Sequence, residues 1–205
     1  MNDHNTLDFR RTIRNSMSTG GIPVNLYTVQ KSKEKSVILT LSDVSGSVMN
    51  FSCFSLALVA SLEKFFRQIH SFAFIDEVDD ITGLLLRGDP LNLRRHVLEK
   101  SKVVGQRGYT NYGYSLRAFY ERHRQYLTPK TTILIFGDGR NNWFEVEAGV
   151  LKEMRRQVKK IYWFNPEAEM LWGSGDSVMQ VYAEVCDKAF ACTNILELEQ
   201  ALSQI

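Results

Sequence analysis

The stretch Leu41-Ser42-Asp43-Val44-Ser45-Gly46-Ser47 directly follows the apolar run Val37-Ile38-Leu39-Thr40 and precedes a long amphipathic segment. The run is almost continuously apolar and rich in β-branched residues, which is typical of a strand buried on both faces. After it, Asp43, Ser45 and Ser47 alternate, and residues two apart in extended backbone point the same way. One carboxylate and two hydroxyls are therefore expected to converge on one point.

These donors are all oxygen atoms, with no histidine or thiolate among them. Such a set suits a hard cation, and we expect Mg²⁺ first, with Mn²⁺ and Ca²⁺ as alternatives. Another interpretation is that Ser45 and Ser47 only cap the following helix, because serine favours that position. Two later segments favour the metal site: the loop Gly108–Gly113 holds Thr110 just before a helix, and Asp138 follows a second apolar run.

Strand-like and helix-like segments alternate along the chain. The patterns predict strands at 24–30, 37–41, 71–74, 78–86, 132–136, 160–164 and 188–192, and helices at 51–69, 91–102, 111–123, 145–159, 178–185 and 194–205. This alternation predicts a doubly wound α/β domain with a mostly parallel central sheet, helices on both faces and one antiparallel edge strand. Ligand sites in such sheets lie beyond the carboxyl ends of the strands, where Asp43 and Asp138 are both placed.

Length and charge limit the remaining options. A chain of 205 residues with 44% hydrophobic content can bury one full core, so we predict one domain over 36–205 and a basic lead-in with a short edge strand over 1–35. The net charge of +2 is the small difference between 25 basic and 23 acidic residues, which argues against nucleic-acid binding. No apolar run approaches the ~20 residues of a membrane span, and the first residues are too polar for a signal peptide.

Three cysteines, Cys53, Cys186 and Cys192, are sparse and lie in apolar contexts. They are expected to be reduced core residues of a cytoplasmic protein. The acidic cluster 76–80 offers a second metal site as a minor alternative, because a hairpin there would turn most of these side chains to solvent. The loop 165–176 is expected at the same sheet edge as the metal loop, and its Trp172 is either an exposed interface anchor or a plug of the domain core.

The spacing of Asp43, Ser45 and Ser47 with the remote Thr110 and Asp138 is similar to a metal-ion-dependent adhesion site (MIDAS), and the chain resembles a von Willebrand factor A domain. Within that superfamily it resembles the CoxE-like family, over nearly its whole length. The segments that carry this narrower resemblance are Phe9–Arg14, Thr19-Gly20-Gly21, Ser42–Ser47, Asp138-Gly139 and Trp163–Pro166. Three departures leave every oxygen ligand in place: Val48 followed by Met49 where the family often has Met directly after the second serine, Tyr109 where it often has glycine, and Gly137 where it often has serine. The segment 137–142 changes the rim of the site.

The resemblance implies a role for each site residue. Ser45 and Ser47 would bind the cation through their hydroxyls, while Asp43, Thr110 and Asp138 would bind it directly or through water. Two carboxylates roughly neutralise a divalent ion, so a vacant position would accept an Asp or Glu from a protein partner. Members of the family are commonly associated with MoxR-type AAA+ ATPases, which implies an adaptor in protein remodelling or metalloenzyme maturation and not an enzyme.

Two other functions remain open at this stage. A metal-dependent phosphohydrolase also begins with an aspartate after a buried strand. However, the residue two positions after Asp43 is Ser45 and not a second acid that could serve as general acid. No lysine follows at a strand end to hold the charge of a phosphate. The second alternative is a scaffold domain with an empty site.

Overall fold

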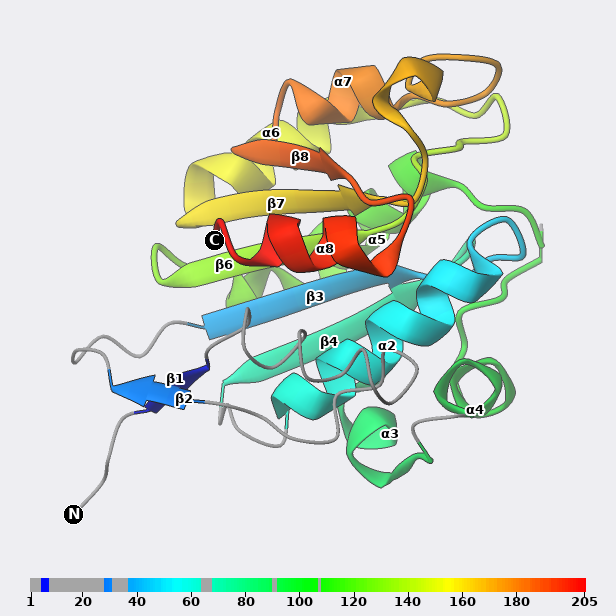
Figure 1. The fold of residues 1–205 in the computed structure, drawn as a ribbon. Helices are drawn as coiled ribbons and strands as arrows, with labels where there is room; N and C mark the ends of the chain where they lie inside the picture. Colours follow the sequence, from blue (N-terminus) through cyan, green and yellow to red (C-terminus); the bar gives the residue numbers. More distant parts are fainter. Residues whose placement is uncertain (1–4, 8–27, 31–36, 64–67, 90–91, 107) are drawn as a thin grey trace.

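A six-stranded sheet forms the centre of the computed structural model, which describes residues 5–7, 28–30, 37–63, 68–89, 92–106 and 108–205. The strand order is β5-β4-β3-β6-β7-β8 (Figure 1). The strands are β3 (Val37–Asp43), β4 (Ile69–Phe74), β5 (Val78–Asp80), β6 (Thr131–Phe136), β7 (Lys160–Asn165) and β8 (Lys188–Ala191). Every neighbouring pair is parallel except β4 and β5, which are antiparallel. The predicted fold class is confirmed, and β5 is its antiparallel edge strand.

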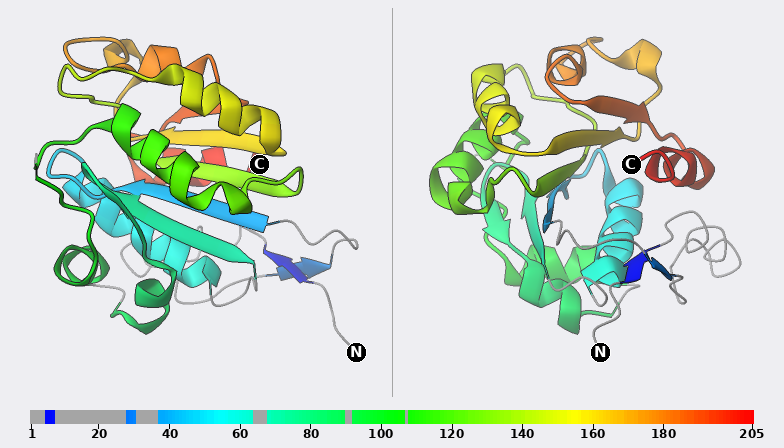
Figure 2. Two further views of the ribbon diagram at one scale, coloured as in Figure 1. Left: turned by 180° about the vertical axis from the view of Figure 1, so that it is seen from behind. Right: turned by 90° about the vertical axis from the view of Figure 1, so that its left-hand side faces the viewer.

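Helices cover both faces of this sheet (Figure 2). One apolar cluster joins one face to α2 (Met49–Glu63), α3 (Thr82–Arg87), α4 (Leu93–Lys100) and α8 (Ile195–Leu202). A second cluster joins the other face to α5 (Tyr112–His123), α6 (Ala148–Gln157) and α7 (Met179–Ala183). Short 3-10 helices lie at η2 (Arg124–Tyr126) and η3 (Glu169–Leu171). Among the residues described, no helix has the length and apolarity needed to cross a bilayer.

The central strand β3 alternates between the two cores. Leu39 and Leu41 belong to the cluster under α5 and α6, while Ile38 packs against the cluster under α2. Because β3 is buried on both sides, its residues must be apolar or small, as the sequence pattern indicated. Only its last residue, Asp43, carries a charge.

The chain adds strands first on one side of β3 and then on the other. From β3 the chain passes through α2 to β4 on one side, whereas β6 pairs with β3 on the other side. The register pairs Ser42 with Phe136, so the carboxyl ends of β3 and β6 are level. This is the topological switch point at which open α/β sheets bind ligands.

The prediction of one strand over 78–86 is wrong, because β5 ends at Asp80 and α3 begins at Thr82. The Asp80 carboxylate accepts the Thr82 backbone N–H at 2.9 Å, and the Thr82 hydroxyl in turn accepts the Ser71 N–H at 3.0 Å. These bonds stop the strand and turn the chain into a helix.

The long helix predicted over 51–69 is also too long, because Ile69 is the first residue of β4, two residues before the predicted start of that strand. Helix α2 ends at Glu63 within the described part of the chain.

Most of the predicted lead-in over 1–35 lies outside the described residues. Of the strand predicted at 24–30, only Thr28–Gln30 (β2) is described, and it pairs antiparallel with Asn5–Leu7 (β1) in a separate two-stranded sheet. The expectation of core positions for all three cysteines is wrong for Cys53, which is exposed, while Cys186 is half-buried and Cys192 is buried.

Candidate metal centre

Asp43, Ser45 and Ser47 stand at the end of β3 in a loop that closes on itself. The Ser45 backbone N–H donates to Asp43 Oδ1 at 2.8 Å, and the hydroxyls of Ser45 and Ser47 are 3.1 Å apart. Arg94 on α4 holds the loop from outside, because its Nη2 donates to the carbonyl oxygens of Val44 at 2.8 Å and Ser45 at 3.1 Å. Asp43 is only 1% exposed. The alternation predicted from the sequence therefore places three oxygen donors together.

Asp138 approaches the same point from the loop after β6. The Ser47 hydroxyl donates to Asp138 Oδ2 at 2.7 Å, across 91 positions of sequence. The Arg140 backbone N–H donates to Asp138 Oδ1 at 2.9 Å, and the Asn165 side-chain amide donates to the Asp138 carbonyl at 2.8 Å. Four of the five predicted ligands are thus joined by one chain of hydrogen bonds, and neither serine hydroxyl caps α2.

Thr110 is buried on the loop before α5. Its carbonyl accepts the Asn142 side-chain amide at 2.9 Å, which ties this loop to the one that carries Asp138. Asp76 anchors the loop further back, since its two oxygens accept the N–H groups of Gly105 at 2.5 Å and Gly108 at 3.0 Å. Among the described residues, no hydrogen bond joins the Thr110 hydroxyl to the other four predicted ligands.

The role of Asp76 differs from the solvent exposure expected for the acidic cluster. Asp76 is buried, and both of its oxygens are bound to backbone amides. It therefore orders the Thr110 loop and is not directed to solvent.

Tyr112, in the first turn of α5, is a site residue that the sequence analysis missed. Its hydroxyl donates to Asp43 Oδ2 at 2.6 Å and lies 3.4 Å from Asp138 Oδ1. A Cβ atom placed on Gly137 would lie 2.1 Å from this hydroxyl. The glycine at 137 was the available signal, because a missing side chain beside a site leaves space for another group.

The two carboxyl groups face each other in a buried setting. Burial, followed by the charge of Asp138, raises the pKa of Asp43 to about 7, although the hydrogen bond from Tyr112 acts in the opposite direction. Burial also raises the pKa of Asp138, despite the hydrogen bonds from the Arg140 amide and Ser47. The Tyr112 hydroxyl stays protonated, because burial and then the two aspartates raise its pKa well above the ordinary value.

No lysine or arginine in the described residues forms a salt bridge with either carboxylate. The nearest guanidinium along the chain, that of Arg140, is directed away and binds Glu167 at 2.7 Å and Asp176 at 2.8 Å. Two buried carboxylates without a paired cation are unfavourable in the ionised form. A divalent cation would supply the missing charge, and the surrounding hydroxyls are ligands that such an ion accepts. The residues present therefore fit a metal.

The described residues hold no metal site built from His, Cys, Asp and Glu side chains alone. They contain no group of three or more His, Cys, Asp or Glu side chains that could hold an ion. The predicted set differs from such a group because three of its five donors are hydroxyls.

The rim of the site carries exposed aromatic side chains. Trp143 is 80% exposed and directly follows Asn142, and Tyr109 is 67% exposed and directly precedes Thr110. Asn142 and Thr110 are joined by the hydrogen bond described above. Asn142 and Trp143 both have positive φ, 49° and 63°, which is uncommon for residues other than glycine. The bond from the Asn142 N–H to Asp176 and the bonds from the Asn141 side chain to the carbonyls of Phe144 and Glu145 hold this backbone in place.

Trp172 is a core residue. It is 7% exposed, belongs to the cluster under α5 and α6, and donates its Nε1 proton to the Glu167 carbonyl at 3.3 Å. The interpretation of Trp172 as an exposed anchor is therefore wrong. Its loop does lie at the metal edge, since Glu167 and Asp176 both bind Arg140.

Solved structures share this fold at low sequence identity. A von Willebrand factor type A protein from Catenulispora acidiphila matches with a TM-score of 0.53 and 13% identity, over 87% of this chain and 43% of its own. BatB from Bacteroides thetaiotaomicron matches with a TM-score of 0.52 and 11% identity, over 82% of this chain and 96% of its own.

Proximal thread matrix protein 1 from the mussel byssus, in a structure described as having a zinc-occupied MIDAS motif, matches with a TM-score of 0.56 and 14% identity, over 86% of this chain and 48% of its own. This chain thus spans less than half the length of the Catenulispora and mussel proteins.

Among curated proteins, none matches this sequence. A family profile does, and it covers residues 2–201 under the description "VWA domain containing CoxE-like protein". The matched residues include the loops that carry Asp43, Thr110 and Asp138. The sheet that positions these loops has the fold of the solved structures named above. The chain belongs to the family of CoxE-like proteins that contain a von Willebrand factor A domain.

Proposed function

We propose that this chain is a metal-dependent protein-interaction module with a MIDAS at Asp43, Ser45, Ser47, Thr110 and Asp138. Mg²⁺ is the proposed ion. The observation that carries the proposal is the pair of buried carboxylates, Asp43 and Asp138, which face serine hydroxyls and have no cationic partner among the described residues.

The chemistry of the ligand set defines the partner. Two carboxylates neutralise a divalent ion, and the remaining donors are neutral hydroxyls, so the metal keeps affinity for one more anionic oxygen. An Asp or Glu side chain of a protein partner supplies that oxygen. Exposed Trp143 and Tyr109 flank the site and offer the aromatic contacts that are common in interfaces.

The partner we propose is a MoxR-type AAA+ ATPase or its client, in protein remodelling or metalloenzyme maturation, in a cytoplasmic setting. The family resemblance supports this part of the proposal. Both serines and both aspartates of the family motif are present and joined by hydrogen bonds.

The proposal gives the site no catalytic role. Ser45 occupies the position at which the phosphohydrolase alternative would need its second acid, and the Ser45 hydroxyl is bound within the loop. With Mg²⁺ present, p-nitrophenyl phosphate should not be hydrolysed above the rate seen with Asp43→Ala, and metal-dependent turnover would favour the enzyme instead.

Calorimetric titration with Mg²⁺ and Mn²⁺ tests the metal site. Wild type should bind one ion, and Asp43→Ala should lose binding while keeping the circular dichroism spectrum of a folded protein. Asp89→Ala, which removes an exposed carboxylate outside the predicted ligand set, serves as the control and should bind like wild type. Equal affinity of wild type and Asp43→Ala would refute the assignment and favour the scaffold alternative.

A further inference from the structure

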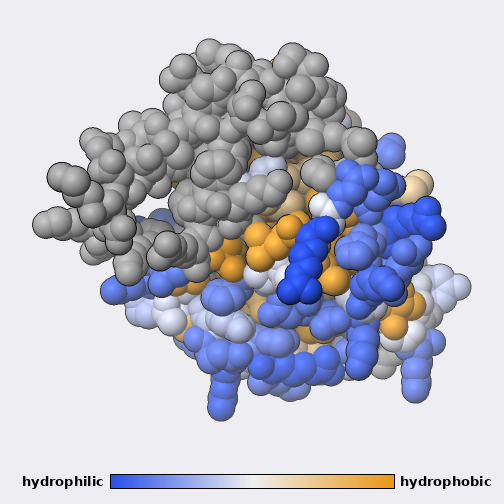
Figure 3. Space-filling view, turned by 90° about the horizontal axis from the view of Figure 1, so that it is seen from below, coloured by the Kyte–Doolittle hydropathy of each residue, from blue (hydrophilic) through white to orange (hydrophobic). Residues whose placement is uncertain are grey.

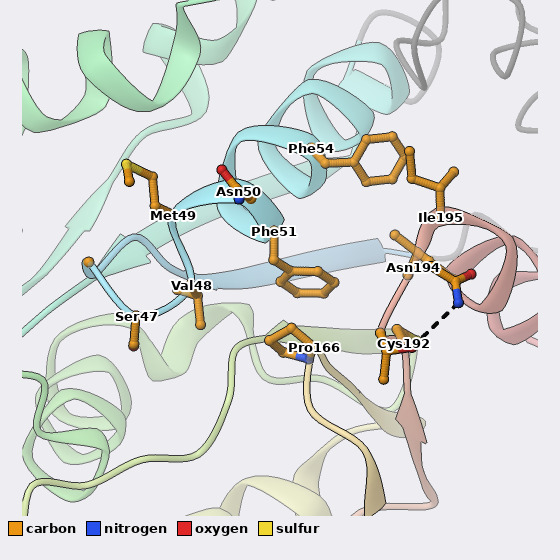
Figure 4. A pocket seen from close by; sticks show the side chains of 13 residues that line it. Ser47, Val48, Met49, Asn50, Phe51, Phe54, Pro166, Cys192, Asn194 and Ile195 are labelled. Carbon is orange, nitrogen blue, oxygen red and sulfur yellow. Dashed lines mark hydrogen bonds between the residues drawn. The ribbon is translucent and has the colours of Figure 1, made fainter.

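An apolar groove begins beside the metal loop. It has a volume of about 430 Å³ and lies between the first turns of α2 and the β8–α8 connection (Figure 4). The Phe51 ring faces Pro166 and Cys192 across it, while Phe54 and Ile195 close the end away from the loop. A volume of this size falls within the range of ~300–1,000 Å³ that is typical of ligand pockets.

The lining determines what can enter. Among the described residues that line it, none carries a charge. The polar groups at the α8 end already have partners: Asn194 accepts the Glu197 N–H at 3.0 Å and caps α8, and the Thr193 hydroxyl donates to Glu197 at 2.8 Å. The described part of the lining therefore suits an apolar side chain and offers no counter-charge to an ionised one.

The groove is continuous with the candidate metal centre through Ser47. This residue lines the groove, and its hydroxyl donates to Asp138 Oδ2 at 2.7 Å. Met49, which is half exposed, also lines the groove, and its flexible side chain can adapt to different apolar shapes. A carboxylate bound at the metal would thus lie beside the Ser47 end of the groove.

We infer that the groove is a subsite for an aliphatic side chain adjacent in sequence to the metal-binding Asp or Glu of a protein partner. This inference rests on the proposed function, because the carboxylate at the metal sets the register of the partner segment. The occupant is an extended peptide with an acidic residue followed by Leu, Ile, Val or Met. Charge complementarity at the metal fixes one end, and burial of the aliphatic group in the uncharged groove fixes the other.

Methyl NMR on the full chain with bound Mg²⁺ tests the inference, with two capped dipeptides as probes, N-acetyl-Asp-Leu-amide and N-acetyl-Asp-Gly-amide. The Asp-Leu probe should bind about tenfold more tightly than the Asp-Gly probe, as expected for partial burial of one leucine side chain. It alone should shift the methyl signals of Ile195 and Leu198. EDTA should abolish binding of both probes.

A pair of matched variants separates the groove from the metal. Ile195→Trp fills the groove and should remove the tenfold preference for Asp-Leu while leaving Mg²⁺ affinity unchanged. Leu196→Trp adds the same side chain at the next position, which is exposed and outside the groove, and should keep the preference.

The outcomes distinguish the two levels of the proposal. Equal, metal-dependent affinity for both probes would overturn the groove inference and leave the proposed function standing. Failure of both probes to bind the Mg²⁺-loaded chain, or binding that persists in EDTA, would overturn the proposed function together with the inference. Shifts of the Ile195 and Leu198 methyls on raising the protein concentration alone would assign the groove to a second copy of the chain and overturn the inference.

Discussion

The hydroxyl of Tyr112 occupies the space that a side chain at Gly137 would need. A Cβ atom at 137 would lie 2.1 Å from that hydroxyl and 2.9 Å from the Asp43 Cβ atom. The same hydroxyl donates to Asp43 Oδ2. Gly137 and Tyr112 therefore depend on each other. The glycine leaves the space, and the Tyr112 hydroxyl fills it and makes the hydrogen bond to Asp43.

Gly137→Ser should destabilise the protein, because overpacking a filled interior costs about 1–3 kcal/mol. Urea unfolding followed by fluorescence measures the loss. Gly149→Ser is the matched control, since an added Cβ there meets no atom within 4 Å, and it should leave the free energy of unfolding nearly unchanged. Equal stabilities of the two variants would show that Tyr112 moves aside without cost.

Tyr112→Phe removes the hydroxyl and keeps the ring, which packs between Phe74 and Trp163. Asp43 then loses a donor that favours its ionised form, so the pKa of Asp43 should rise above its value in wild type. In calorimetry, the pH at which half of the maximal metal affinity is reached should shift upward. An unchanged pH profile would mean that the hydroxyl does not influence the ionisation of Asp43.

The raised pKa of Asp43 also gives the metal-free protein a specific pH dependence. In the folded state Asp43 keeps its proton up to about pH 7, whereas the unfolded chain releases it near the ordinary value of 3.8. The contribution of this group to stability is therefore complete below that ordinary value and is lost as the pH rises towards 7. Asp43→Asn, which cannot titrate, should lack this component in thermal unfolding measured from acidic to neutral pH.

Metal binding should follow the opposite trend, because the ion needs the ionised carboxylate. Below pH 7 each bound ion displaces a proton from Asp43. The affinity for Mg²⁺ should therefore fall about tenfold for each unit by which the pH is lowered. Titrations in buffers of different ionisation enthalpy measure the released proton directly. A pH-independent affinity between 5 and 7 would contradict the raised pKa.

The sequence predicted the parts of this molecule that depend on local pattern and on chain topology. The apolar run before Asp43 is typical of a buried strand, and the carboxyl ends of parallel strands meet at one edge of the sheet. The pairing of β3 with β6 then brings Asp43 and Asp138 together at that edge. Thr110 was predicted from its place before a helix, and the cap of that helix is the adjacent Asn111.

The errors arose where tertiary contacts decide. The residues Leu84–Leu86 read equally well as strand or helix, and the bonds of Thr82 to Asp80 and Ser71 select the helix. Tyr112 looked like any apolar residue of an amphipathic helix, because its partner carboxylates are 26 and 69 positions away. For Trp172 the sequence left two interpretations open, an exposed anchor and a plug of the core, and the loop folds its ring into the core. Trp143, at the same edge of the sheet, is exposed.

Trp143 and Trp172 provide the final prediction, because the two side chains have opposite surroundings at the same edge of the sheet. Trp172→Ala empties a buried position and should cost about 3–5 kcal/mol of unfolding free energy. Trp143→Ala removes an exposed ring and should change stability by less than about 0.5 kcal/mol. If Trp143 contacts the partner beside the metal, Trp143→Ala should weaken Mg²⁺-dependent capture of the proposed partner, a MoxR-type ATPase, while keeping Mg²⁺ affinity at the wild-type value. Full retention of capture by Trp143→Ala would move the interface away from this rim, towards the groove beside Ser47.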